Sequence, residues 1–220
     1  MDDLDRRGAV VIRPGEEQND TRSAILDIAE RLVQSRGFNG FSYADVAGEL
    51  GITKAALHYH FPGKAELGEA LIVGYAARFL ESLEAIDHRV TAAVDKLRAY
   101  ADLYLEVLSH GRMCLCGMLA AEYETLPDPM RLSVVRFFDD NSAWLATLLE
   151  AGRAQGSLVF PGQADDAAQL IIGALEGAML VGRPYGGTAR FEAVASRLIA
   201  EFAAPGQPFS PTRFAVPQDR

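Results

Sequence analysis

Apolar residues recur every three to four positions along most of this chain, which is the spacing of amphipathic α-helices. The first such series occupies one face of a helix and consists of Ile25, Ile28, Ala29, Leu32 and Val33. We expect this helix to be capped at Asp20 or Thr21 and to end at Gly37, because glycine adopts the left-handed conformation of a C-cap at little cost.

The rest of the pattern predicts helices and no strands, so the expected fold class is all-α. Helices are expected near residues 64–86, 91–108, 114–124, 130–155, 164–182 and 188–202. Glycine and proline interrupt the helical period at His110-Gly111, at Leu126-Pro127-Asp128-Pro129 and within 156–162. Residues 1–20 are polar and are expected to form a flexible arm, and residues 205–220, with four prolines, are expected to form an extended tail.

Residues 42–61 predict two short helices joined by a tight turn, the helix-turn-helix arrangement that places its second helix in the major groove of DNA. Ser42 and Asp45 have the spacing of a capping box that starts the first helix. The residues expected at the helix crossing, the turn, the shared core and the second N-cap are, in that order, Ala47, Gly51, Ile52 and Thr53.

The run that follows is Leu57-His58-Tyr59-His60-Phe61-Pro62-Gly63-Lys64, in which Pro62 ends the second helix and Lys64 opens the next. With this run, residues 21–68 resemble the N-terminal domain of the TetR family of transcriptional regulators, although His58 stands where tyrosine is usual. The resemblance implies an all-helical dimer whose larger C-terminal domain binds a small ligand that weakens DNA binding. We therefore divide the chain into a helix-turn-helix domain (21–67) and a helical ligand-binding and dimerisation domain (68–204), between the arm and the tail.

Candidate DNA contacts lie on the second helix of the motif and at the starts of its neighbours. Thr53, Lys54 and Ala55 begin the helix that would enter the groove, so we expect them at base edges, with the Lys54 ammonium donating to guanine and the Ala55 methyl contacting thymine. The further candidates, taken from helix starts and from the positions that the resemblance implies, are Arg22, Ser42, His58, Tyr59, His60 and Lys64.

The net formal charge of −9 argues at first against a nucleic-acid partner. Residues 21–68, however, hold five basic and five acidic side chains, so this segment is neutral and the remainder carries the whole deficit. A neutral domain can still bind phosphates through a few placed donors, and we expect its non-specific affinity for DNA to be modest.

The segment Gly111–Leu119 combines two glycines with two thiols and two thioethers, which belong to Met113, Cys114, Cys116 and Met118. These soft side chains either fill a crowded helix junction, line a ligand pocket, or include a thiol that senses an electrophile or oxidant. His110 and Arg112 would lower the pKa of such a thiol. At most one thiol should face a pocket, and we favour Cys116, because later apolar residues continue its helix face.

Further candidates for the wall of a ligand pocket are large or polar side chains in the expected C-terminal domain, namely Tyr104, Phe137, Phe138, Trp144, Glu176 and Met179. Glu176 lies in an otherwise apolar run, where a lone carboxylate is costly unless it is paired. It is expected to pair with Arg153 or Arg183, or to bind a cationic group of a ligand.

The last two expected helices have the features of a dimerisation unit. An apolar stripe at helical spacing consists of Phe191, Val194, Ala195, Leu198, Ile199 and Phe202, and Gly173 and Gly177 would allow another helix to approach closely. These faces pack either within one protomer or against a partner. The resemblance favours the dimer, which a helix-turn-helix also needs to contact two half-sites.

Other classes of protein find little support in the sequence. No apolar run is long enough to span a membrane, the acidic start is unlike a secretory signal, and two cysteines spaced Cys-x-Cys form no disulfide framework, so we expect a cytoplasmic protein. Four scattered histidines suggest no metal site, and no motif suggests catalysis or a cofactor. We expect a homodimeric repressor that a small molecule releases from a palindromic operator in double-stranded DNA. The alternatives are a thiol-based sensor on the same scaffold and, more distantly, a helical enzyme or interaction adaptor.

Overall fold

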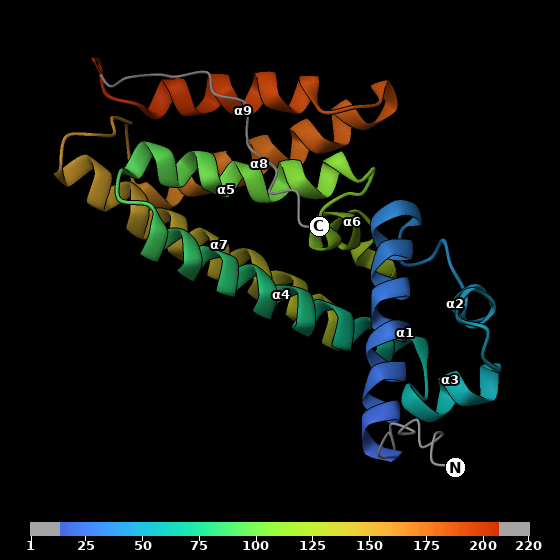
Figure 1. The fold of residues 1–220 in the computed structure, drawn as a ribbon. Coiled ribbons are helices and arrows are strands. Elements are labelled where there is room, and N and C mark those ends of the chain that lie inside the picture. The colour runs from blue at the N-terminus through green and yellow to red at the C-terminus, as the bar shows by residue number, and fades with distance from the viewer. Residues whose placement is uncertain (1–13, 207–220) are drawn as a thin grey trace, which may run out of the picture.

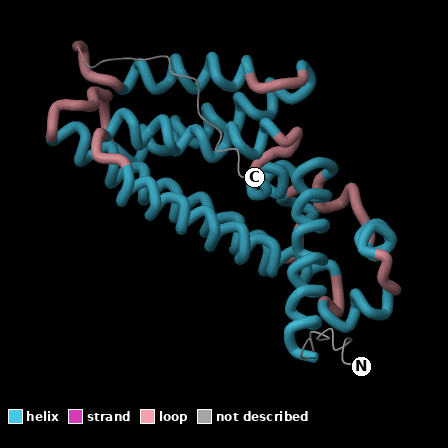
Figure 2. Tube along the Cα trace, in the orientation of Figure 1, coloured by secondary structure: helices cyan, strands magenta, loops and turns pink. Residues whose placement is uncertain are grey.

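The structure is a computed structural model that describes residues 14–206 and consists of helices joined by loops in this range (Figure 2). The helices are α1 (Pro14–Arg36), α2 (Tyr43–Leu50), α3 (Lys54–His60), α4 (Lys64–Arg89), α5 (Ala93–Ser109), α6 (Leu115–Ala121), α7 (Asp128–Ala154), α8 (Ala164–Gly182) and α9 (Ala189–Phe202). Two short 3-10 helices, η1 (Tyr123–Thr125) and η2 (Arg183–Tyr185), follow α6 and α8. The prediction of an all-α fold is confirmed.

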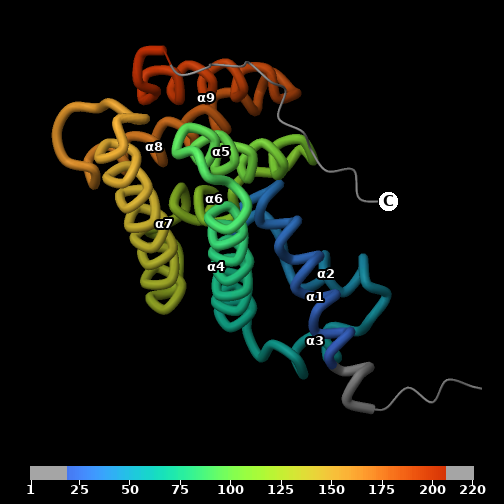
Figure 3. The backbone as a smooth tube through the Cα atoms, turned by 60° about the vertical axis from the view of Figure 1, so that its left-hand side comes forward, coloured from blue at the N-terminus to red at the C-terminus, as the bar shows by residue number. Residues whose placement is uncertain are grey.

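The molecule has a small N-terminal head and a larger helical body (Figure 1). Helices α1, α2 and α3 form the head. Helix α4 leads out of it and runs beside α7, while α5, α8 and α9 pack at the far side of the body, with α9 outermost (Figures 1 and 3). The short helix α6 lies between head and body and contacts α1, α4 and α7.

Two sequence predictions about element boundaries require correction. Helix α1 begins at Pro14, so residues 14–20 are helical instead of belonging to a flexible arm. These residues are polar and show no apolar period, and proline suits the first turn of a helix. The helix expected over residues 114–124 is divided into α6 and η1. The expected arm residues 1–13 and most of the expected tail lie outside the described residues.

The predicted helix-turn-helix is confirmed in its local geometry. Ser42 and Asp45 form the capping box, in which the Asp45 carboxylate accepts from the Ser42 N–H at 2.7 Å. Gly51 adopts φ +71° at the turn, and Thr53 Oγ1 accepts from the Ala56 N–H at 3.1 Å to cap α3. Ala47 is buried where α2 meets its neighbours. These caps supply partners for backbone groups that short helices leave unpaired.

Head and body share one contiguous hydrophobic core. Helix α4 carries this core across the expected domain boundary at residues 67 and 68, because its buried face runs from Leu67 and Leu71 in the head to Phe79 and Leu83 in the body. At Gly68 a side chain would collide with Met130 of α7 and Phe38 of the head, so a glycine there permits the close packing. The orientation of the head is therefore coupled to the packing of α4.

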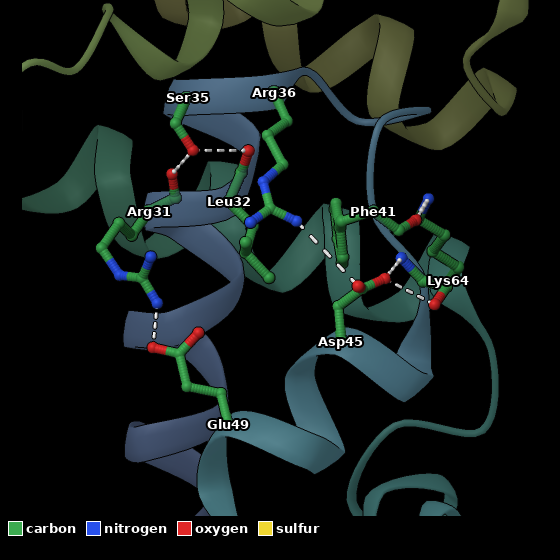
Figure 4. Close-up of polar contacts among 9 residues, drawn as sticks. Arg31, Leu32, Ser35, Arg36, Phe41, Asp45, Glu49 and Lys64 are labelled. Atoms are coloured by element: carbon green, nitrogen blue, oxygen red, sulfur yellow. Dashed lines mark hydrogen bonds and ion pairs between the residues drawn. The ribbon is translucent and has the colours of Figure 1, made fainter.

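The loop that follows α1 (residues 37–41) is held by side chains from distant parts of the chain. The Glu122 carboxylate accepts from the Phe38 N–H at 2.5 Å and from the Asn39 N–H at 3.3 Å. On the other side, the Lys64 ammonium donates to the Phe38 carbonyl. It also donates to the Phe41 carbonyl and lies 4.2 Å from the centre of the Phe41 ring (Figure 4). The loop is thus clamped between the body and the start of α4.

Two more contacts attach the end of α1 to the body. The Met113 N–H donates to the Gln34 carbonyl at 3.1 Å, and the Arg183 guanidinium donates to the Ser35 carbonyl. Carbonyls in the last turn of a helix have no partner within the helix, so these contacts satisfy backbone groups that would otherwise need water. Because Arg183 follows α8 directly, the end of α1 is joined to two separate parts of the body.

We predict that Gly37→Ala destabilises the protein more than Gly51→Ala does. Both glycines have positive φ, +85° and +71°, and alanine there costs about 1–2 kcal/mol. A Cβ on Gly37 would also lie 2.8 Å from Glu122 Oε1 and would displace the carboxylate from the loop N–H groups, whereas a Cβ on Gly51 meets nothing within 4 Å. Urea unfolding of the two variants measures the difference.

The same comparison in a Glu122→Ala background is the control. Without the carboxylate, the two glycine substitutions should cost the same, because only the left-handed backbone strain remains. Equal costs in the parent protein would show that Glu122 does not hold the loop.

Candidate nucleic-acid interface and ligand site

The N-terminus of α3 presents the residues predicted to face base edges. Lys54 and Ala55 are exposed, and Lys54 makes no ion pair within the described part of the chain. The Thr53 hydroxyl accepts the capping hydrogen bond from Ala56, which leaves its own proton able to donate. This end of the helix therefore offers one mobile cation, one methyl group and one hydroxyl to a groove.

The C-terminal half of α3 presents aromatic side chains. Tyr59 is 72% exposed, with its ring edge-to-face against the part-buried His60 at 5.3 Å. The His58 ring packs against Tyr43 at 4.8 Å, and its Nδ1 lies 3.0 Å from the Pro62 carbonyl. His58 can therefore reach a partner outside the protein only through its other ring nitrogen.

Three of the predicted phosphate donors already contact other parts of the protein. The Ser42 hydroxyl donates to Asp45 at 2.6 Å, and the Arg22 guanidinium lies over the Phe61 ring at 4.9 Å. The Lys64 ammonium points into the loop of residues 37–41, where burial lowers its pKa and Glu122 and Asp45 oppose that shift. The backbone N–H of Lys64 lies at the start of α4, where a helix favours a bound anion. A phosphate contact at this N–H remains a prediction.

Ion pairs between α1 and α2 join some of the opposite charges of the head (Figure 4). Arg31 pairs with Glu49, and Arg36 Nη1 lies 3.9 Å from Asp45 Oδ1. Hydrogen bonds from Ser42 and the charge of Arg36 lower the pKa of Asp45, so this carboxyl is ionised at neutral pH. These two arginines already have acidic partners, whereas Lys54 makes no ion pair within the described part of the chain.

A second group of polar side chains converges in the core of the body. We call it the polar cluster; its members are Tyr75 (α4), Tyr100 and Tyr104 (α5), Cys114 (N-cap of α6), Asn141 (α7) and Glu176 (α8). The Tyr100 and Tyr104 hydroxyls lie 3.0 Å apart, and Tyr100 also donates to Asn141 Oδ1 at 3.3 Å. Burial raises the pKa of all three tyrosines. Convergent polar groups in an apolar interior are typical of small-molecule sites.

Cys114 belongs to the polar cluster, and Cys116 is close enough for the Glu176 carboxylate to raise the pKa of its thiol. The Cys114 thiol is 3.7 Å from the Tyr75 hydroxyl, accepts from the Gly117 N–H at 3.4 Å and hydrogen-bonds the Glu176 carboxylate. Cys114 precedes α6 instead of lying on it, so helical periodicity gives no information about its direction.

Both thiols are buried, and burial raises the pKa of each, with further increases from Glu176. The expected lowering by His110 and Arg112 is therefore wrong. His110 is exposed and its Nδ1 contacts the Glu106 carbonyl at 2.9 Å, and Arg112 lines a surface crevice. A thiol with a raised pKa is a poor nucleophile at neutral pH.

Glu176 has no cationic partner among the described residues, which corrects the pairing expected from the sequence. Arg153 bonds Glu150 and the Gly162 carbonyl, and Arg183 bonds the Ser35 carbonyl. Burial instead raises the pKa of Glu176 to about 7, against a smaller opposing effect of its hydrogen bond with Cys114. Its Oε1 atom is buried and has no hydrogen-bond partner in the described range.

The other predicted pocket residues surround the polar cluster or lie at its edge. The Phe137 ring lies 5.7 Å from the Tyr75 ring, tilted against it, and Met113 and Met179 are buried in the same core. The Trp144 ring stacks on Tyr100 at 5.7 Å while its indole N–H bonds Asp87 at 2.8 Å. Met118 lies farther out, with its sulfur 3.6 Å from Arg183 Nη1, and the part-buried Phe138 packs against the core.

Sequence reasoning missed Tyr75, Tyr100 and Asn141. Asn141 carried a usable signal, because it is the one polar residue on the buried stripe of α7, which otherwise reads Met130, Val134, Phe137, Leu145 and Leu148. An amide in such a stripe needs a buried partner. Tyr75 and Tyr100 carried no such signal, because tyrosine is common on buried helix faces.

The apolar stripe of α9 is mostly part of the protomer core. Four residues of the stripe are already buried within the protomer, namely Phe191, Ala195, Ile199 and Phe202. These residues therefore pack inside one protomer and not against a partner. Helix α8 instead exposes a second stripe at helical spacing, consisting of Leu170, Gly173, Leu180 and Val181 with the part-exposed Gly177. Side chains on the two glycines would meet nothing within 4 Å. We call this surface the α8 face.

Two negative findings concern the described residues alone. No helix between residues 14 and 206 combines the length and apolar character needed to cross a membrane. Within the same range, no three His, Cys, Asp or Glu side chains are grouped closely enough to hold a metal ion.

Comparison with known proteins gives a consistent result along the chain. The family of bacterial regulatory proteins known as the tetR family matches residues 25–71, and the tetracyclin repressor-like C-terminal domain matches residues 93–198. The HTH-type transcriptional regulator TtgR of Pseudomonas putida is 37% identical over 106 residues, which span only 47% of its length. The HTH-type transcriptional repressor NemR of Escherichia coli is 28% identical over 74% of this chain and 84% of its own.

Solved structures show the same fold. A TetR family regulator from Agrobacterium tumefaciens superposes with a TM-score of 0.82 at 32% identity, covering 85% of this chain and all of that one. The reduced form of E. coli NemR has a TM-score of 0.73 at 26% identity, again covering 85% of this chain and all of the other. The matches therefore include both head and body.

We predict that Glu176→Gln stabilises the protein at high pH. The folded protein holds a proton up to about pH 7 that the unfolded chain releases above its ordinary pKa of 4.5. Ionisation of Glu176 therefore costs stability progressively between pH 4.5 and 7, and the full cost, about 3 kcal/mol at most, is present above pH 7. Urea unfolding should show the variant to be more stable at pH 8, with the advantage nearly lost by pH 4.

Glu84→Gln, which changes an exposed carboxylate on α4, is the matched control and should show no such pH dependence. A stability difference for Glu176→Gln that is the same at every pH would mean that the carboxyl titrates normally in the folded protein.

Proposed function

The chain belongs to the TetR family of bacterial regulatory proteins, whose members are transcriptional regulators, and we propose that it is a homodimeric repressor released from a palindromic operator by a small molecule. The observation that supports this most strongly is the capped helix pair that exposes Lys54 and Ala55 at the start of α3, attached to a body with a buried polar cluster. The double-stranded DNA target implies that the protein acts in the cytoplasm.

We propose that the α3 N-terminus contacts base edges and that Tyr59, His60 and the start of α4 contact phosphates. Few unpaired cations support these contacts, so electrostatic attraction supplies a small part of the binding free energy. Selection of bound sequences from random double-stranded DNA, followed by titration at several salt concentrations, tests the proposal. We expect a palindromic site and a weak dependence of affinity on salt.

Lys54→Ala should relax the base preference at one position in each half-site and weaken specific binding by about 1–3 kcal/mol per contact. The physical reason is the loss of an ammonium that donates to a base edge. Affinity measurements on the selected operator and on single-base variants of it provide the test. Arg89→Ala removes one exposed cation at the opposite end of α4 and is the control, expected to leave base preference unchanged.

Retention of the parental base preference in Lys54→Ala would exclude this residue from base contact. Failure of the parent to select any sequence would instead contradict the proposed function as a whole.

We propose that the dimer forms through the α8 face together with the outer surface of α9. The glycines of this face allow close approach of a partner helix, and the flanking Leu170, Leu180 and Val181 would bury apolar area that water now covers. A symmetric contact of this kind would fix the spacing of the two heads, which operator binding requires.

Leu180→Glu should convert the dimer into monomer, because it would bury an unpaired carboxylate in the contact. Leu180 is 58% exposed in the protomer, so the substitution should not disturb the protomer fold. Sedimentation velocity gives the oligomeric state. Leu132→Glu on α7, where the leucine is 72% exposed, is the matched control and should remain dimeric. A parental dimer in Leu180→Glu would place the interface elsewhere.

We propose that the effector binds in the body at the polar cluster. A thiol-based response finds less support, because both cysteines are buried and their pKa values are raised. NemR, to which the chain is similar, is a named repressor with a solved reduced form. In the present chain the surroundings of both thiols make them poor nucleophiles. This favours an effector that binds reversibly and without a covalent bond.

A further inference from the structure

We propose that the polar cluster takes a cationic effector, an organic ammonium group flanked by aromatic surface, with Glu176 as its counter-charge. The inference rests on the proposed effector role of the cluster and adds the chemical class of the ligand. It follows from three features: the carboxylate without a counter-ion, the aromatic side chains around it, and a crevice that shares Tyr75 with the cluster.

The Glu176 carboxylate has no oppositely charged partner among the described residues. Its Oε1 atom is buried and has no hydrogen-bond partner among the described residues, and contact with the Cys114 thiol lowers its pKa only partly. The groups that face it from α4, α5 and α6 are tyrosines and cysteines, none of which is a cation. A buried carboxylate of this kind is costly, and a bound cation would remove that cost.

The surroundings of Glu176 suit an ammonium better than a hydrated metal ion. The rings of Tyr75, Phe79, Tyr100, Tyr104 and Phe137 pack on one another with centroids 5.3 to 6.3 Å apart. Aromatic faces attract organic cations, and the attraction is largest where water is excluded. An anionic effector would meet Glu176 as a like charge and would find no compensating cation among these residues.

A crevice beside the polar cluster offers space next to Tyr75. A crevice of about 240 Å³ lies between α1 and α5 and is lined by Glu30, Gln34, Tyr75, Glu106, Val107, His110 and Arg112. Tyr75 belongs to both the crevice and the cluster, because its hydroxyl contacts Cys114. The buried Gln34 Oε1 at the opposite wall also has no partner in the described range. Of its charged lining residues, Glu30 is paired with Arg78, and Glu106 faces the crevice together with Arg112.

This geometry couples ligand binding to the head. Tyr75 must move for an effector to reach Glu176, and the opposite wall of the crevice is the end of α1. The Gln34 carbonyl in that wall accepts from Met113, the residue before Cys114. A cation at Glu176 would therefore displace the segment that holds the last turn of α1.

The experiment compares benzyltrimethylammonium, a permanent cation, with neopentylbenzene, its neutral isostere, and with phenylacetate, an anion. The readout is the fluorescence of Trp144, the only tryptophan of the chain, which stacks on Tyr100 at the edge of the cluster. We expect the cation to bind the full-length protein at least tenfold more tightly than the isostere and phenylacetate not to bind.

Two variants localise the effect. Glu176→Gln removes the charge with little change of shape and should abolish the preference for the cation, so that the two probes bind alike. Glu84→Gln removes an exposed carboxylate on α4 and should keep the preference. Equal affinity of the two probes for the parent, absence of binding by the cation, or an unchanged preference in Glu176→Gln would each overturn the proposal.

The pH dependence provides an independent readout. Below about pH 7 Glu176 is protonated in the free protein, so the cation must displace a proton and its affinity should fall about tenfold between pH 8 and pH 6. The tyrosines and cysteines that face Glu176 have raised pKa values and do not titrate in this range. Glu176→Gln should show no such dependence, and a flat profile in the parent would contradict the assignment.

Operator binding separates failure of this inference from failure of the proposed function. A protein that binds its operator but shows no preference for the cation is a regulator of another ligand class, whereas a protein that binds no operator contradicts the proposed function. Release of the operator by benzyltrimethylammonium in the parent, and its absence in Glu176→Gln, would support both.

Discussion

The last turn of α1 depends on hydrogen bonds that other parts of the chain provide. Its carbonyls at Gln34 and Ser35 and the N–H groups of the following loop have partners in the body, supplied by Met113, Arg183 and Glu122. Helix ends need such partners, and here they come from the body instead of from water. The orientation of the head, and with it the position of α3, is therefore set by the body.

Helix α6 is the element through which these contacts meet the polar cluster. Cys114 at its N-terminus touches Tyr75 and Glu176, while the preceding residue, Met113, holds the end of α1. Glu122 at its C-terminus holds the loop of residues 37–41. This helix of seven residues is therefore tied at one end to the cluster and at both ends to the head. This is the physical form that a ligand response would take in this regulator.

Local signals predicted most of the fold, and distant contacts account for what they missed. The capping box, the turn glycine and the apolar period of α1 each depend on neighbours in sequence, and the structure confirms them. The inward direction of the Lys64 ammonium depends on a loop more than 20 residues away. Periodicity likewise identified the α9 stripe as buried but could not tell whether the covering surface was α5 and α8 or a partner. Glu176 lacks a cationic partner because Arg153 and Arg183 bind other groups. No sequence pattern predicts the directions of these two side chains.

The packing of Gly117 against Glu176 couples the conformations of these two positions. A Cβ at position 117 would meet Glu176 Oε2, which is the far end of a flexible side chain, so a larger residue there would require the carboxylate to turn away. The cost of such a replacement is therefore the cost of reorienting the acid and not of moving the backbone. Residue 117 on α6 is thus a second position, outside α8, from which the direction of the Glu176 carboxylate can be altered.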